Sequence, residues 1–209
     1  MTKMKIIGRE YEQAVINNYL ESGKAELIAV YGRRRVGKTY LIQEFFNCKF
    51  SFFATGIIDG DKDEEMYSFT SSLIEAGYKG RQPVTWLEAF DALKETLSSL
   101  PHKGKYVIYI DELPCFDTPK SGFLPAFEHF WNGFAALRKD ILLIICGSAT
   151  SWVINEILYS RGGLHNRVTR PIPLAPFTLA ECEEYAKSNG LAFDRRQIAE
   201  CYMAIGGVA

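Results

Sequence analysis

Residues 26–39 read ELIAVYGRRRVGKT, and their pattern indicates the fold class. Its first part, Glu26 to Tyr31, has the apolar character of a buried strand. Gly32 to Thr39 then match the pattern G-x-x-x-x-G-K-[ST] at every position. Lys38 to Asn47 follows with a helical pattern. A strand, a glycine loop and a helix in this order predict a phosphate-binding loop in an α/β fold.

Each residue type in this loop has a chemical reason to hold phosphate. Glycine permits positive φ, so backbone N–H groups can close around phosphate oxygens, and the start of the helix adds partial positive charge there. Lys38 supplies a cation for the β- and γ-phosphates, and Thr39 offers a hydroxyl to Mg²⁺. We therefore predict that ATP or ADP, with Mg²⁺, contacts Gly32, Arg33, Arg34, Arg35, Val36, Gly37, Lys38, Thr39 and Tyr40. The three arginines are interpreted as a solvated loop tip near the phosphates, with a special role as the alternative.

A second strand ends in two acids. Tyr106 to Ile110 is a continuous apolar run, and Asp111 and Glu112 follow it directly. A carboxylate at the carboxyl end of a central parallel strand lies beside the phosphate loop. We predict that Asp111 is the metal-side carboxylate and that Glu112 is the general base that polarises the attacking water. The alternative interpretation is a strand followed by an acidic turn.

A third apolar strand, Ile141 to Cys146, runs into Gly147-Ser148-Ala149-Thr150. If it lies between the other two strands, its polar end points at the γ-phosphate. Ser148 or Thr150 could then bond the attacking water or the phosphate, and we favour Ser148 because it is nearer the strand end. Ordinary helix-capping residues in a strand-to-helix turn are the alternative.

The remaining segments alternate between strand and helix, which predicts an α/β fold with a parallel sheet flanked by helices. Prolines place the strand Thr169 to Leu174 at an edge of the sheet. The aromatic-rich helix Phe123 to Leu137 is interpreted as core rather than as a partner surface. The other expected elements are a strand at Phe50–Ala54 and helices at Glu64–Gly77, Thr85–Leu100 and Ser151–Tyr159, the last with Ser151 as its N-cap.

The character changes near residue 177. A capping box at Thr178 to Glu181 opens a helix that extends to about Lys187, and a second helix is expected at Asp194 to Ile205. We predict a phosphate-loop ATPase core over 1–176. Residues 177–209 are interpreted as the beginning of a truncated helical lid.

Composition and charge indicate which partners and which cellular location to expect. The chain has 209 residues and a formal net charge of -1, which gives no global attraction to nucleic acid or membrane. No stretch resembles a signal peptide or is long enough to span a bilayer, so no membrane partner is expected. Five cysteines without a C-x-x-C pair are interpreted as reduced thiols of a cytoplasmic protein.

Together these segments resemble the additional-strand, catalytic-glutamate class of P-loop ATPases. More narrowly, the chain resembles the AAA+/STAND-related ATPases of bacteria and archaea, the archaeal ATPase family. The residues that support the resemblance are Gly8-Arg9-Glu10, Tyr31 to Thr39, Ile110 to Leu113, Cys146 to Ser148, Arg167 with Pro173 to Phe177, and Gly206 to Val208.

The resemblance implies a strand order of 5-1-4-3-2 and a helical lid after the core. It implies that Gly8, Arg9 and Glu10 lie near the adenine, and that Ser148 is in the first sensor position. Arg167 is the best match to an arginine finger that acts on a neighbouring subunit, with Arg161 second and a structural turn as the alternative. A homo-oligomer of the full-length protein is therefore expected. Relatives continue into further domains, through which DNA or a protein effector could act.

Two functions from different classes fit this site. The first is an enzyme that hydrolyses ATP with Mg²⁺ to drive a conformational change. The second is a STAND-type signalling switch that binds nucleotide and turns over slowly. Transfer to a small-molecule hydroxyl is disfavoured by the adjacent acids, and GTP is disfavoured because no Asn-Lys-x-Asp stretch is present.

Overall fold

The computed structural model describes residues 6–101, 104–159, 162–164 and 166–208. Its centre is a five-stranded sheet in the order β2-β3-β4-β1-β5, and every neighbouring pair is parallel. Read from the other edge, this is the predicted order 5-1-4-3-2, which is confirmed. The strands are β1 (Glu26–Tyr31), β2 (Phe52–Thr55), β3 (Tyr106–Asp111), β4 (Ile141–Gly147) and β5 (Arg170–Pro173).

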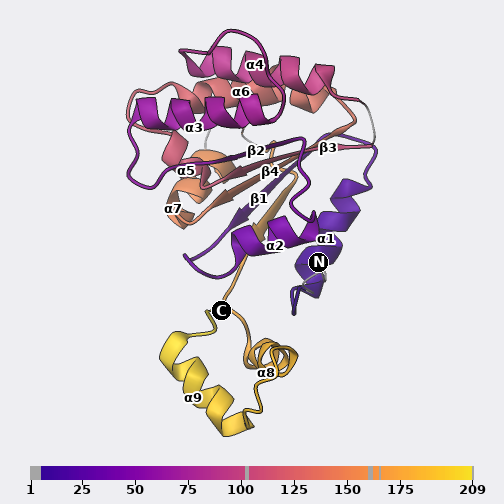
Figure 1. The fold of residues 1–209 in the computed structure, drawn as a ribbon, viewed down its shortest axis with the longest axis vertical. Coiled ribbons are helices and arrows are strands. Elements are labelled where there is room, and N and C mark those ends of the chain that lie inside the picture. The colour runs from indigo at the N-terminus through magenta and orange to yellow at the C-terminus, as the bar shows by residue number, and fades with distance from the viewer. Residues whose placement is uncertain (1–5, 102–103, 160–161, 165, 209) are drawn as a thin grey trace.

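Helices cover both faces of the sheet, as expected for parallel strands joined by crossovers. Figure 1 shows α3 (Lys62–Glu75), α4 (Trp86–Ser99) and α6 (Phe123–Gly133) stacked on one face. The other face is covered by α1 (Glu10–Leu20) and α2 (Lys38–Phe45). The short helices α5 (Leu113–Phe116) and α7 (Thr150–Trp152) follow β3 and β4.

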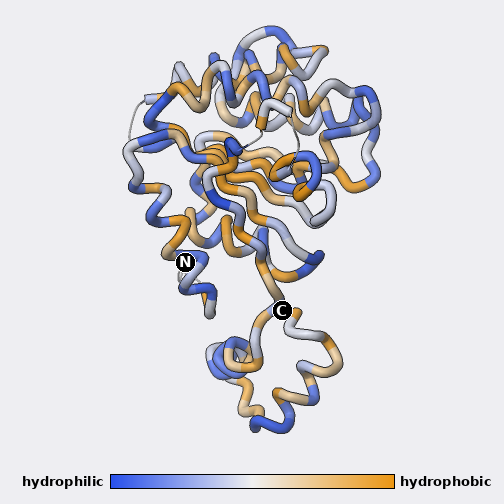
Figure 2. The backbone as a smooth tube through the Cα atoms, turned by 180° about the vertical axis from the view of Figure 1, so that it is seen from behind, coloured by the Kyte–Doolittle hydropathy of each residue, from blue (hydrophilic) through white to orange (hydrophobic). Residues whose placement is uncertain are grey.

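Alternating side chains of each strand supply the two halves of the core. In β1, Leu27 and Ala29 pack toward α3, α4 and α6, whereas Ile28 and Val30 pack toward α1 and α2. Apolar residues accordingly concentrate along the strands (Figure 2). The prediction that the aromatic residues of α6 belong to the core is confirmed for Phe127, Phe130 and Trp131, which are all buried.

Some predicted boundaries differ from the structure. The helix expected to reach Leu137 ends as α6 at Gly133 and is followed by a separate 3-10 turn, Ala135–Leu137. Ser151 is not an N-cap, because α7 already begins at Thr150. The Thr150 N–H is bonded to the Ser148 carbonyl at 2.9 Å, so the chain turns immediately after β4. A π-helix, Val153–Leu158, continues the segment.

The three polar strand ends meet at the carboxyl edge of the sheet. Because β1, β3 and β4 are parallel neighbours, the phosphate loop, the acidic pair and Ser148 all follow strands at this edge. β5 also ends there and leads through residues 174–177 into α8 (Leu179–Ser188) and α9 (Arg195–Ile205). Figure 1 shows these two helices, here called the α8–α9 unit, beyond the layers of the core.

The ends of the α8–α9 unit follow the expected capping chemistry. The capping box at Thr178 and Glu181 is confirmed, and Asp194 forms a second one with Gln197. Within the described ranges, no helix combines the length and the apolar character that crossing a bilayer requires.

Candidate nucleotide-binding and hydrolysis site

The backbone of the phosphate loop depends on its two glycines. Gly37 has φ 87° and immediately precedes the first residue of α2. Gly32 has φ 154°, and a Cβ atom placed there would lie 2.3 Å from the Leu174 carbonyl oxygen. Only glycine therefore fits where the loop passes the end of β5. The loop thus leads directly into the N-terminus of α2, where unpaired backbone N–H groups favour anions.

Lys38 lies inside the loop rather than on its surface. Its side chain is 5% exposed. Its Nζ donates hydrogen bonds to the carbonyl oxygens of Gly32 at 3.0 Å and Arg33 at 2.9 Å. The ammonium is therefore held within the turn of the loop that precedes α2. A buried cation at this point attracts anionic phosphate oxygens strongly.

Thr39 and Asp111 bring two hard oxygen ligands together. The Thr39 hydroxyl donates to Asp111 Oδ2 at 2.8 Å, although Thr39 lies on α2 and Asp111 is the last residue of β3. Asp111 is 4% exposed, and burial raises the pKa of its carboxyl above the ordinary value. The hydrogen bond from Thr39 opposes this rise by favouring the carboxylate. A hydroxyl and a carboxylate side by side are the kind of donor set that Mg²⁺ binds.

Glu112 follows Asp111 at the end of β3, and its carboxylate is bonded to Ser148, which follows the adjacent strand β4. Its Oε2 accepts hydrogen bonds from Ser148 N–H at 3.0 Å and from Ser148 Oγ at 2.9 Å. Its backbone has φ 45° and ψ 47°, a left-handed conformation that is costly for a residue with a Cβ. The side chain of Ser148 thus bonds the second acid. The other candidate, Thr150, lies at the start of α7.

One residue that the sequence analysis missed supports this acidic turn. Gly56 follows β2, and its N–H donates to the Asp111 carbonyl at 3.0 Å. A Cβ at Gly56 would lie 2.6 Å from Cys115 Cβ and 2.7 Å from the Glu112 carbonyl oxygen. A glycine directly after a strand was the available signal, because it often marks a close approach of two backbones.

The other predicted contact residues lie around the loop. Arg33, Arg34 and Arg35 are exposed, and Tyr40 is exposed on the first turn of α2. Glu10 is exposed at the start of α1, whereas Arg9 is buried. The Arg9 side chain donates to the carbonyl oxygens of Val36 and Ala175, contacts that the sequence analysis did not foresee.

The predicted finger residue lies apart from this cluster. Arg167 is exposed, and its backbone N–H donates to the Leu164 carbonyl at 2.9 Å. Its guanidinium makes no hydrogen bond or ion pair with any residue that the structure describes. The second candidate, Arg161, lies outside the described residues.

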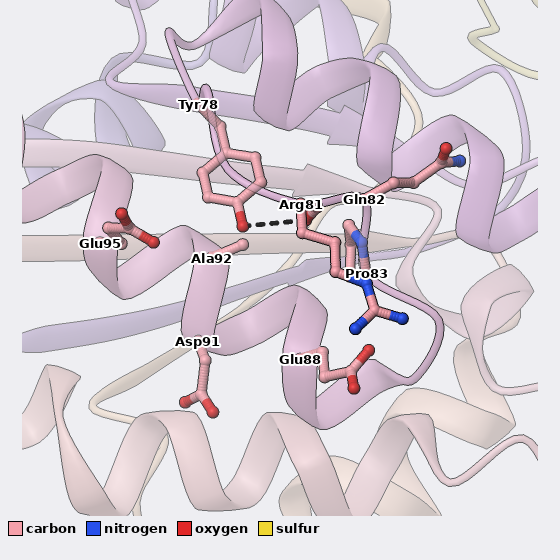
Figure 3. A pocket seen from close by; sticks show the side chains of 8 residues that line it. All are labelled: Tyr78, Arg81, Gln82, Pro83, Glu88, Asp91, Ala92 and Glu95. Atoms are coloured by element: carbon pink, nitrogen blue, oxygen red, sulfur yellow. Dashed lines mark hydrogen bonds between the residues drawn. The ribbon is translucent and has the colours of Figure 1, made fainter.

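A surface hollow elsewhere has no part in this site. It is lined by Tyr78, Arg81, Gln82, Pro83 and residues of α4, with the Tyr78 hydroxyl bonded to the Arg81 carbonyl (Figure 3). None of the predicted site residues lines it.

The strand order, the loop and the acidic pair define a P-loop nucleotide-binding domain of the ATPase type. Residues 7–209 match the sequence model of an ATPase domain found predominantly in Archaea. The chain belongs to this family.

Individual proteins are also similar to this chain in sequence or in fold. An uncharacterized protein of Methanocaldococcus jannaschii, MJECL04, is 24% identical over 180 residues, which cover 86% of this chain and 38% of that protein. The Walker-type ATPase PABY2304 of Pyrococcus abyssi superposes with a TM-score of 0.65 at 18% identity, covering 97% of this chain and 64% of that one.

The ORC2 protein of Aeropyrum pernix, solved in ADPNP and ADP complexes, gives a TM-score of 0.66 at 14% identity and covers 91% of this chain and 53% of that one. At these identities, the structural likeness shows the shared fold. The chain spans less than two thirds of the length of each of these three proteins.

Proposed function

We propose that this domain binds ATP together with Mg²⁺ and hydrolyses it by attack of a water that Glu112 activates. The observation that supports this most strongly is the pair of contacts at adjacent strand ends. Thr39 is bonded to Asp111, and Ser148 is bonded to Glu112. Both contacts lie beside a complete phosphate loop, which is the arrangement that hydrolysis of a bound triphosphate requires.

Each residue of the candidate site has a role that follows from its chemistry. Lys38 and the loop amides bind the β- and γ-phosphates, and Thr39 with Asp111 would hold Mg²⁺, which neutralises phosphate charge when it is bound. Glu112 is half-buried and follows the metal-side acid, where a carboxylate can accept a proton from water. Ser148 orients that carboxylate. Arg9 and Glu10 lie at the entrance to α1, on the proposed adenine side.

Replacing Glu112 by Gln tests this assignment, because the change removes the base and leaves the loop and Asp111 intact. We expect ATP affinity to stay within about threefold of wild type while phosphate release falls by at least about 100-fold. Phosphate release and nucleotide affinity would be measured with Mg²⁺ and with EDTA, and EDTA should abolish release in the wild type. Normal release from the E112Q variant would show that another group activates the water.

A STAND-type switch with slow turnover is the second candidate. The observation in its favour is that both hydrogen bonds from Ser148 converge on one oxygen of Glu112, which restrains the base before any reaction. In this case the wild type would bind ATP tightly and release phosphate far more slowly than the roughly 1–10³ s⁻¹ of typical enzymes. The phosphate-release assay therefore separates the two candidates.

We propose in addition that residues 1–176 form the ATPase core and that the α8–α9 unit acts as its lid. The supporting observation is that the unit follows β5 at the same edge of the sheet as the phosphate loop. A lid at this edge would exclude water from the reacting phosphate.

A further inference from the structure

Arg9 lies where three parts of the molecule meet. Its Nη2 donates to the carbonyl oxygen of Val36 in the phosphate loop at 3.3 Å. The same nitrogen donates to the carbonyl oxygen of Ala175, in the linker to the α8–α9 unit, at 2.7 Å. The guanidinium carbon also lies 4.6 Å from the centre of the Phe177 ring. One side chain therefore contacts the phosphate loop and the linker together.

The backbone around Arg9 fits the same junction. Gly8 and Arg9 have φ of 65° and 62°, so the chain enters α1 through two left-handed residues. A Cβ at Gly8 would lie 2.8 Å from Oε1 of Glu181, the residue that closes the capping box of α8. The segment before α1 is thus pressed against the first turn of α8.

Phe177 is in turn fixed to the far end of the α8–α9 unit. Its N–H donates to the Gly207 carbonyl at 2.9 Å, and a Cβ at Gly207 would lie 2.3 Å from the Phe177 carbonyl oxygen. A displacement of the unit therefore displaces Phe177, and with it one of the surfaces that Arg9 contacts.

The charge of Arg9 makes these contacts interdependent. Its side chain is only 7% exposed, and its Nη1 lies 3.9 Å from a carboxylate oxygen of Glu12. A buried cation depends on its hydrogen bonds and on aromatic faces to offset the loss of water. If the loop moves, Arg9 loses the Val36 carbonyl, and if the unit moves, it loses Ala175 and Phe177.

We infer that Arg9 is a positioning residue that couples the conformation of the phosphate loop to the position of the α8–α9 unit. This inference rests on the proposed nucleotide binding. Phosphates in the loop change the environment of Val36, and Arg9 transmits that change to the linker. A coupling of this kind is reciprocal, so the position of the unit also affects nucleotide affinity.

The Arg9→Lys substitution tests whether the proposed coupling needs the contacts of the guanidinium or only its positive charge. The R9K variant keeps a cation, but one ammonium lacks the planar fork and the broad face that stacks on an aromatic ring. The matched control is R170K, because the Arg170 guanidinium also bonds and stacks on an aromatic residue of α1, Tyr11. Within the described part of the chain, this guanidinium makes no hydrogen bond with the loop or the linker. The F177L variant removes the ring and leaves the Arg9 hydrogen bonds in place.

Hydrogen–deuterium exchange, with and without ADP, tests the inference in two regions. In the wild type and in R170K, ADP should slow exchange in the phosphate loop and also in α8. At ADP concentrations that saturate each variant, the loop of R9K and of F177L should still respond, whereas the response of α8 should fall at least about fivefold. Thermal unfolding without nucleotide would report separately any general loss of stability.

The outcomes distinguish this inference from the proposed function. A wild-type response in α8 of both R9K and F177L would overturn the coupling role while leaving nucleotide binding intact. A wild-type protein whose loop responds to ADP while α8 does not would have the same consequence. If ADP changes neither region of the wild type, the proposed function fails and the coupling fails with it.

Discussion

At the scale of single residues, three carboxyl groups near the sheet edge have different surroundings. Asp111 is buried but receives the Thr39 hydroxyl, and Glu112 is half-buried and receives both donors of Ser148. Glu65 is fully buried on α3, where its Oε1 accepts the Ile57 N–H at 2.8 Å. None of the residues that the structure describes donates a hydrogen bond to its Oε2. We propose catalytic roles for the first two carboxyls, whereas we expect the third to affect stability.

Burial raises the pKa of Glu65 from 4.5 to about 7. Because the folded protein favours the protonated form, this contribution to stability is complete below the ordinary pKa and is lost as pH rises through about 7. Glu65→Gln keeps an oxygen for Ile57 and cannot ionise. We therefore expect the free energy of unfolding of E65Q, relative to wild type, to increase by on the order of 1–3 kcal/mol between pH 5 and pH 8.

Urea denaturation at the two pH values measures this difference. Glu75→Gln is the matched control, since Glu75 is exposed on the same helix and its replacement should give no pH-dependent difference. An E65Q protein whose stability relative to wild type is the same at pH 5 and pH 8 would contradict the account of this buried acid.

At the scale of elements, the strands were the easiest part to predict. β1, β3 and β4 are mostly apolar runs buried on both faces, and each ends at or directly before a glycine or a polar residue. Asp111, Glu112 and Ser148 were therefore recognisable as strand ends from local pattern alone. Their order in the sheet came from the family resemblance and not from the pattern.

Contacts between distant segments could not be predicted in this way. Ser148 bonds a residue 36 positions away, and Arg9 bonds Ala175 across 166 positions. Periodicity describes which face of an element is buried, but such partners depend on how whole elements pack. The start of the helix at Ser151 was also predicted wrongly, because no side chain caps α7 and a local backbone bond from Thr150 to Ser148 begins the turn.

At the scale of the whole molecule, the carboxyl edge of the sheet is where the core meets the α8–α9 unit (Figure 1). The loop passes the end of β5 so closely that Gly32 cannot carry a side chain. The linker and the phosphate loop are therefore in direct contact at Gly32, in addition to the contacts that each makes with Arg9. Arg167 precedes β5 and is exposed, so it is available to a second molecule.

We predict that Arg167 acts on the site of a neighbouring molecule. Phosphate release per wild-type molecule should then rise as protein concentration increases. Arg167→Ala should lower release at high concentration at least about tenfold, because a finger arginine stabilises transition-state charge. The ATP affinity of the R167A variant should equal that of the wild type. Arg81→Ala is the control, since Arg81 is an exposed arginine of the α3–α4 connection. Equal release from R167A and wild type at high concentration would contradict a role in trans.

For the whole domain, we propose that the Gly32–Thr39 loop binds the phosphates of ATP. The most direct test is a titration of a fluorescent ATP analogue into wild type, Lys38→Ala and Lys49→Ala, the last an exposed lysine just beyond α2. Because Lys38 is the buried cation within the loop, its removal should weaken binding at least about tenfold, about 1.4 kcal/mol. Lys49→Ala should bind as tightly as wild type. Equal affinities of wild type and K38A would contradict the account.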